Sequence, residues 1–175
     1  CANLREVTFN GGLETIGMNA FAYDNGKHTA IATLRFPETL KKIGEQAFYG
    51  STNLSSVVLN EGLEEIGLRA FSSGGPDCYG LTSVDIPESV EVIGGGVFSG
   101  STNLWTITGG EGVIECAYNT MFGTDVPAFE CKEFEADGRT PLPFKVVKFG
   151  KVVLGFQGPC KSSLTAEDFG DAEEI

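Results

Sequence analysis

Residues 54–71, LSSVVLNEGLEEIGLRAF, carry the pattern that decides the fold of this 175-residue chain. The pattern L-x-x-V-x-L-(four)-L-x-x-I-G-x-x-A-F recurs with small changes at residues 4–21, 31–48 and 81–98. A weaker copy begins at Leu104 and a remnant at Cys131. The copies begin at residues 4, 31, 54, 81, 104 and 131, which are 27, 23, 27, 23 and 27 residues apart, so two copies form a repeat of 50 residues. A period of this size predicts a solenoid of stacked coils.

The columns of the repeat that stay apolar give the physical reason for stacking. The first column consists of Leu4, Ile31, Leu54, Leu81, Leu104 and Cys131. One copy alone cannot bury its apolar residues, whereas stacked coils turn each column into a continuous buried row. Val7 and Phe9 are expected to point inward and Thr8 outward, which is the alternation of a strand. We interpret residues 13–16 as a second short strand or extended segment on the opposite wall.

Turn residues follow the length of each coil. The 23-residue coils leave their first strand at Pro37 and Pro87, which suit a strand end because proline donates no hydrogen bond. The 27-residue coils use asparagine and glycine there, which serve turns with left-handed geometry. A glycine column, formed by Gly17, Gly44, Gly67 and Gly94, follows the isoleucine column. It predicts either a bend with positive φ or a close approach of two backbones.

The complete pattern resembles the BspA-type leucine-rich repeat, and residues 86–98 (IPESVEVIGGGVF) carry it almost whole. The resemblance covers about residues 1–131, and the fifth copy departs from it because Cys116 and Ala117 replace isoleucine and glycine. The resemblance implies a mainly β, right-handed parallel β superhelix on a secreted or cell-surface protein that binds other macromolecules. We therefore expect an extracellular or cell-surface location.

The solenoid is predicted to occupy residues 1–140, and residues 141–175 to form a C-terminal β-hairpin cap with an acidic tail. Residues 144–156 (FKVVKFGKVVLGF) contain two apolar runs around Gly150 and Lys151, which predicts a hairpin. Its apolar residues would cover the last coil. Residues 4–9 would form an edge strand with no visible cap. Either further coils precede this strand, or it pairs with another chain.

Charge and composition exclude several classes of function. The chain has 12 Lys and Arg against 24 Asp and Glu, a net charge of −12, which argues against nucleic acid or an anionic membrane surface as partner. No apolar run is long enough to predict membrane insertion. His28 is the single histidine, so two-histidine metal sites are impossible. We predict no cofactor, no metal, no catalytic residue and no enzymatic activity.

Five cysteines, an odd number, contain no C-x-x-C pair; they are Cys1, Cys78, Cys116, Cys131 and Cys160. Cys116 and Cys131 fall on interior columns, where they are either buried thiols or a bridge. Cys1 is either a residue within a coil or a lipid-modified anchor. Cysteine usage therefore leaves the compartment open.

Two surfaces are candidates for binding. The long coils carry loops at residues 22–30, 72–80 and 122–130, which should project from one flank about 10 Å apart. The loop residues best suited to contact are Tyr23, Asp24, His28, Asp77 and Tyr79. The alternative is that these loops are solvated and have no partner.

The outward residues of the first strands form the second candidate surface, a strip of small hydroxyl side chains that also contains Arg35 and Asp85. Trp105, the only tryptophan, is expected on an outward position, where it is either an interface residue or packed under the C-terminal segment. On the other wall, Lys41 and Lys42 lie between glutamate rows, which predicts structural charge pairs.

The sequence thus predicts a non-enzymatic, adhesin-like binding module of a secreted or cell-surface protein. Its partner would be a protein or glycan, on a host or a neighbouring cell, contacted through the strand face and the long-coil loops. The alternative is a structural spacer that displays another domain within a larger surface protein.

Overall fold

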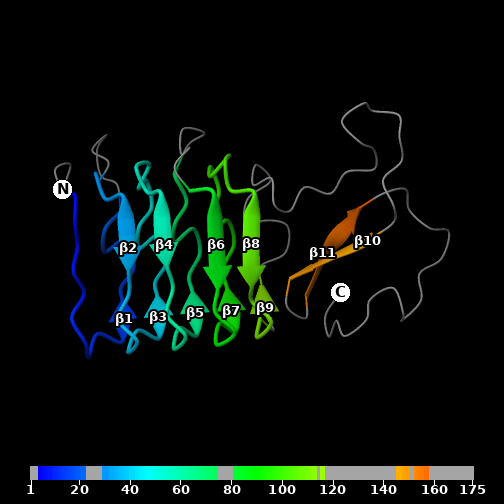
Figure 1. Ribbon diagram of the computed structural model, residues 1–175, viewed down its shortest axis with the longest axis horizontal. Coiled ribbons are helices and arrows are strands. Elements are labelled where there is room, and N and C mark those ends of the chain that lie inside the picture. The colour runs from blue at the N-terminus through cyan, green and yellow to red at the C-terminus, as the bar shows by residue number, and fades with distance from the viewer. Residues whose placement is uncertain are drawn as a thin grey trace.

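The computed structural model describes residues 4–22, 29–74 and 81–113, and the backbone of short strands at 115–116, 145–149 and 152–157. Its coils stack side by side along one axis, as Figure 1 shows. The described residues contain strands and turns and no helix. The predicted class, a leucine-rich-repeat β solenoid, is confirmed.

One wall of the solenoid, here called the second wall, is a continuous parallel sheet. Its order is β1-β3-β5-β7-β9. The strands are β1 (Thr15–Ile16), β3 (Lys42–Ile43), β5 (Glu65–Ile66), β7 (Val92–Ile93) and β9 (Glu115–Cys116). Each isoleucine pairs with the next, and Ile93 pairs with Cys116, so the fifth coil keeps the register although its sequence departs. The predicted second short strand is confirmed.

The opposite, first wall consists of strand pairs. It contains β2 (Thr33–Arg35), β4 (Ser56–Val58), β6 (Ser83–Ile86) and β8 (Thr106–Gly109). β2 pairs with β4 and β6 with β8, both in parallel and both across a 23-residue step. Among the described residues no backbone hydrogen bond joins β4 to β6, and Figure 1 shows the wider spacing between these two arrows.

Residues 4–9 do not form the predicted edge strand. The backbone link between them and the next coil is the Ala30 N–H, which donates to the Leu4 carbonyl at 2.9 Å, and no ladder continues to β2. Both unpaired junctions of the first wall therefore fall at 27-residue steps. We call the junction between residues 4–9 and β2 the first seam, and that between β4 and β6 the second seam. The alternation between hydrogen-bonded and unbonded first strands thus follows the same 50-residue repeat.

The core lies between the walls and follows the predicted columns. Ile31, Leu54, Leu81 and Leu104 are at most 2% exposed, and Leu4 packs half-buried against them. A second column, Phe21, Phe48, Phe71 and Phe98, stacks face to face. Its ring centroids are 5.1, 5.5 and 5.6 Å apart, with 3–9° between planes. Each ring therefore buries the next, which a single coil could not do.

Close approach to the backbone of the preceding coil explains three of the four glycines in the column, Gly44, Gly67 and Gly94. A Cβ on Gly44 would lie 2.8 Å from the Ile16 carbonyl oxygen, and one on Gly67 would lie 2.6 Å from the Glu45 amide nitrogen. None of the four glycines has a positive φ. The prediction left two reasons open, and the structure supports the second.

Positive φ occurs two residues later, on Asn19, Gln46 and Arg69 (57°, 52° and 53°) and on Gly96 (61°). The sequence pattern did not indicate this column, because three of its four members are not glycine. In the turns after the first strand, Gly12 has the predicted positive φ of 94°. Gly62 does not; a Cβ there would lie 2.6 Å from the Glu38 carbonyl oxygen. Asn60 instead donates its side-chain amide to the Leu40 carbonyl at 3.0 Å.

Strands β10 (Lys145–Phe149) and β11 (Val152–Gln157) form the predicted antiparallel hairpin. Phe149 pairs with Val152, which leaves Gly150 and Lys151 between the strands. The hairpin's side chains, the acidic tail and the domain boundary near residue 140 lie outside the described residues. Its role as a cap therefore stays a prediction.

Candidate functional site

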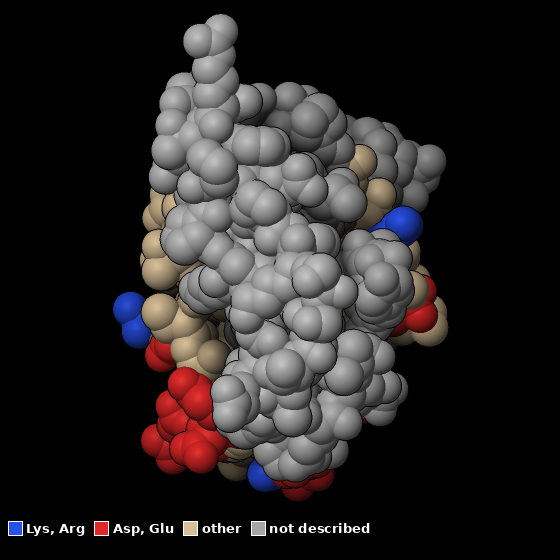
Figure 2. Space-filling model, turned by 90° about the vertical axis from the view of Figure 1, so that its right-hand side faces the viewer, with Lys and Arg blue, Asp and Glu red and all other residues tan. Residues whose placement is uncertain are grey.

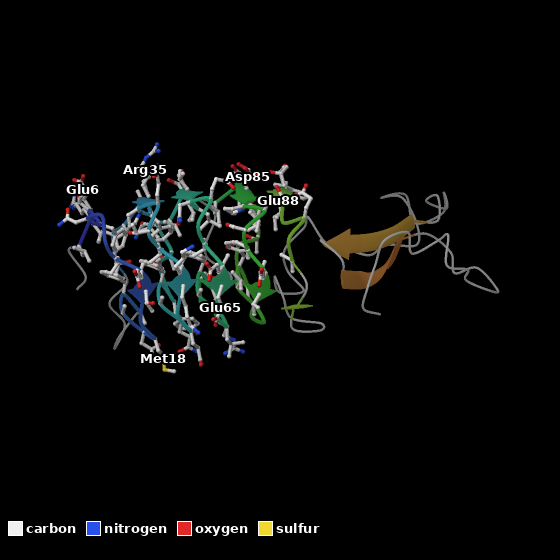
Figure 3. All side chains as sticks on the ribbon, turned by 90° about the horizontal axis from the view of Figure 1, so that it is seen from below. Glu6, Met18, Arg35, Glu65, Asp85 and Glu88 are labelled. Atoms are coloured by element: carbon white, nitrogen blue, oxygen red, sulfur yellow. The ribbon has the colours of Figure 1, made fainter. Side chains whose placement is uncertain are left out.

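The outward residues of the first wall form rows across the coils, as predicted. Thr33 lies beside Ser56, and Ser83 beside Thr106. These side chains are small and carry hydroxyl groups that both donate and accept hydrogen bonds. In Figure 3, Glu6, Arg35, Asp85 and Glu88 lie along this side of the molecule, and Met18 and Glu65 lie on the other.

Arg35 and Asp85 hold equivalent positions on β2 and β6, and both are exposed. Their neighbours differ. Arg35 lies beside Val58, which is 42% exposed, whereas the Thr108 hydroxyl donates to the Asp85 carboxylate at 2.5 Å. The arginine is therefore available to a partner, and the aspartate already accepts one hydrogen bond.

Trp105 is 66% exposed and lies directly before β8. Its backbone N–H donates to the Thr82 carbonyl at 3.1 Å, which ties its backbone to the preceding coil. Tryptophan offers a large, rigid apolar surface with one hydrogen-bond donor. This exposed ring beside the hydroxyl rows is the largest apolar contact that the strip presents.

The five candidate loop residues, Tyr23, Asp24, His28, Asp77 and Tyr79, lie outside the described residues. The anchor of the first loop is described. Thr29 is buried, its hydroxyl lies 3.1 Å from that of Ser51, and its carbonyl accepts from the Asn53 side-chain amide at 3.1 Å. The end of this loop is therefore tied to the next coil.

A groove of about 600 Å³ lies along the first seam. Its polar lining includes Arg5, Glu6, Thr8, Thr33 and Arg35. Its apolar lining includes Val7, Phe9, Phe36 and Pro37. Neither arginine forms an ion pair within the described part of the chain. The sequence marks Arg35 as a candidate but not Arg5, because the two lie 30 residues apart at different positions of the repeat and no column joins them.

Other charges form rows along the corners and the second wall. Lys41 bonds to Glu64 at 2.8 Å and Lys42 to Glu65 at 2.6 Å, which confirms the predicted charge pairs. Exposed acids also occupy the turn after each first strand from the second coil on, at Glu38, Glu61, Glu88 and Glu111. Figure 2 shows the largest group of Asp and Glu side chains at the lower left, with smaller groups at the right and at the bottom.

Within residues 4–22, 29–74 and 81–113, no three His, Cys, Asp or Glu side chains gather as metal ligands would. The described part of the chain also contains no helix with the length and hydropathy of a membrane span.

Stacked coils with apolar ladders, a parallel wall and an isoleucine-glycine turn define a leucine-rich-repeat solenoid. The model of the BspA type leucine rich repeat region matches residues 1–104 and 23–133, with six copies. The chain belongs to this family. No curated protein matches it.

Two solved structures share the fold. One is a leucine rich cell surface protein from Faecalibacterium prausnitzii A2-165, with a TM-score of 0.61 and 21% identity over 74% of this chain. The other is a leucine-rich repeat protein from Bacteroides ovatus, with a TM-score of 0.52 and 16% identity over 79% of this chain. The aligned part spans 32% and 39% of those two chains, about a third of their length.

Proposed function

We propose that this chain is a non-enzymatic, adhesin-like binding module of a secreted or cell-surface protein. It contacts a protein or a glycan through its strand face and its long-coil loops. The observation that carries this proposal is the exposed Trp105 beside the hydroxyl rows of the first wall.

The chemistry of that face suits recognition of a polar, extended surface. Tryptophan is enriched among the residues that supply most of the binding energy in interfaces, and its ring stacks on apolar faces of a partner. Thr33, Ser56, Ser83 and Thr106 have short side chains, so a partner can approach the wall closely and exchange hydrogen bonds with them. The net charge of −12 disfavours a polyanionic partner such as nucleic acid.

Membership of the BspA-type family and the likeness to a cell surface protein support a surface location. The first of these concerns the sequence and the second the fold. Because the chain spans only about a third of the two solved structures, the function proposed here is that of a module.

The test immobilises the chain and screens a glycan array and a panel of purified extracellular-matrix proteins by biolayer interferometry. Trp105→Ala should weaken binding of the best ligand at least tenfold, since an interface tryptophan is worth about 2 kcal/mol or more. Met18→Ala is the matched control, because Met18 is equally exposed at 63% but lies on the other wall. Equal losses in both variants, or no ligand at all, would contradict the proposal.

The alternative is a spacer that displays another domain. The continuous five-stranded second wall and the stacked phenylalanines favour it, because both resist bending of the coil stack. A spacer would bind nothing in either screen and would keep its function when Trp105 is replaced.

A further inference from the structure

We propose that the groove at the first seam binds an extended acidic peptide segment. This inference rests on the proposed binding function and names the partner chemistry for one part of the strand face.

The backbone of β2 has unpaired hydrogen-bonding groups on the side of this groove, although residues 4–9 pack against it. In a strand of a parallel sheet, the N–H and C=O of one residue both point to the strand on one side. Those of the next residue point to the other side. Ser56 N–H donates to Ala32 carbonyl oxygen at 3.2 Å, so the backbone groups of Thr33 and Arg35 point the other way, towards the first coil. Neither forms a backbone hydrogen bond to residues 4–9. A peptide in the groove can therefore bond to these groups without displacing a ladder of hydrogen bonds.

The side chains around the groove favour an acidic partner. Arg5 and Arg35 both line the groove, and neither has a carboxylate within ion-pair distance among the described residues. A guanidinium binds a carboxylate through two parallel hydrogen bonds, which is a strong and directional contact. Glu6 offsets one of the two positive charges. The groove is thus locally cationic on a chain whose net charge is −12.

The lining of the groove also favours a peptide in which acidic and apolar side chains alternate. Its apolar lining includes Val7, Phe9 and Phe36, and its volume of about 600 Å³ lies in the range of ligand sites. Successive side chains of a strand point to opposite faces, so one set meets the apolar lining and the other meets the arginines. A peptide that alternates acidic and β-branched residues satisfies both.

The second seam provides an internal comparison. β6 lies beside β4 without backbone hydrogen bonds between them, so its backbone groups on this side are unpaired in the same way. Asp85 stands there at the position that Arg35 holds at the first seam, 50 residues earlier. Its carboxylate repels an acidic peptide and already accepts from Thr108. We therefore expect the first seam, and not the second, to select acidic peptides.

Fluorescence anisotropy with two labelled heptapeptides, TVEVTVE and TVKVTVK, tests the proposal. We expect the glutamate peptide to bind and the lysine peptide to bind at least fivefold more weakly. Arg35→Ala and, separately, Arg5→Ala should weaken the glutamate peptide at least fivefold, while Asp85→Ala leaves its affinity within twofold. Circular dichroism melting confirms that each variant is folded. Amide hydrogen exchange should show new protection at Thr33 and Arg35 when the peptide is bound.

Equal affinity for the two peptides, or equal losses in Arg35→Ala and Asp85→Ala, would overturn the proposal. An acidic oligosaccharide, a hexuronate hexamer, is the competing probe. If it binds through Arg5 and Arg35 and the peptide does not, the groove is a glycan site. If neither probe binds while the Trp105-dependent ligand still does, this inference fails and the proposed function stands.

Discussion

Gly67 lies so close to Glu45 that a Cβ on the glycine would be 2.6 Å from the glutamate's amide nitrogen, in the coil before it. The contact is between two backbones, so no side chain can move to relieve it. The same closeness recurs at Gly44 and Gly94, and it sets how tightly the second wall stacks.

Gly67→Ala should therefore lower the free energy of unfolding by about 1–3 kcal/mol, the usual cost of forcing extra volume into a packed site. The matched control is Gly17→Ala, because a Cβ on Gly17 meets nothing within 4 Å and its φ is not positive. Urea unfolding followed by circular dichroism measures both. A Gly67→Ala variant as stable as the control would show that neighbouring coils can move apart here without cost.

Arg69→Gly should stabilise the chain by about 0.5–1 kcal/mol. Arg69 has a φ of 53°, a conformation that costs a residue with a Cβ about 1–2 kcal/mol, and glycine recovers most of it. Gly96 already holds the equivalent position, so Gly96→Ala should destabilise. Leu68→Gly is the control, since its φ is not positive and glycine there only adds flexibility. The readout is the urea midpoint, and a fall in Arg69→Gly would contradict the argument.

Phe71→Ala should destabilise by about 3–5 kcal/mol, as large-to-small changes of buried aromatics do. Phe71 is 3% exposed and stacks on Phe48 and Phe98. Phe21→Ala should cost less, because that ring is only partly buried and stacks on Phe48 alone among the described rings of its column. Thermal melts compare the two variants. Equal losses of stability would show that the rings of this column do not act as a shared core.

Reversing the charge of Lys41 and Lys42 together, K41E/K42E, should destabilise by about 1 kcal/mol at low salt. The change replaces two exposed ion pairs with like charges opposite Glu64 and Glu65. The loss should shrink by more than half in 0.5 M NaCl, because salt screens surface charges. K41Q/K42Q removes the attraction without adding repulsion. Its free energy of unfolding should lie between those of the unchanged protein and of K41E/K42E. A loss of stability that does not depend on salt would show that charge repulsion is not its cause.

Much of the candidate strip could be predicted because outward positions follow from the period-2 alternation of each strand. The rows that contain Arg35 and Asp85 are one example, since register between coils follows from the repeat itself. The groove could not be predicted in this way. Arg5 and Arg35 are 30 residues apart, and they line one groove only because the first wall is unpaired at that step.

The glycine column and the column of positive φ also differ in how much the sequence could predict. The repeat marked Gly44 and Gly67 as positions that exclude a Cβ, but two physical causes give the same sequence signal, and only the backbone geometry separated them. The positive φ of Gln46 and Arg69 left no mark in the sequence, because neither residue prefers this conformation. Each donates its backbone N–H to the next coil, at 2.8 and 2.9 Å, which helps to hold it there.

The repeat already specifies that the chain coils, how long each coil is and which residues point inward, since a repeated apolar column can be buried only by stacking. Which neighbouring strands are hydrogen-bonded became visible only in the folded molecule. The 23-residue steps bring first strands into a ladder, whereas the described 27-residue steps leave them packed side by side without one. That choice depends on the distance between coils in space, which no single copy of the repeat encodes.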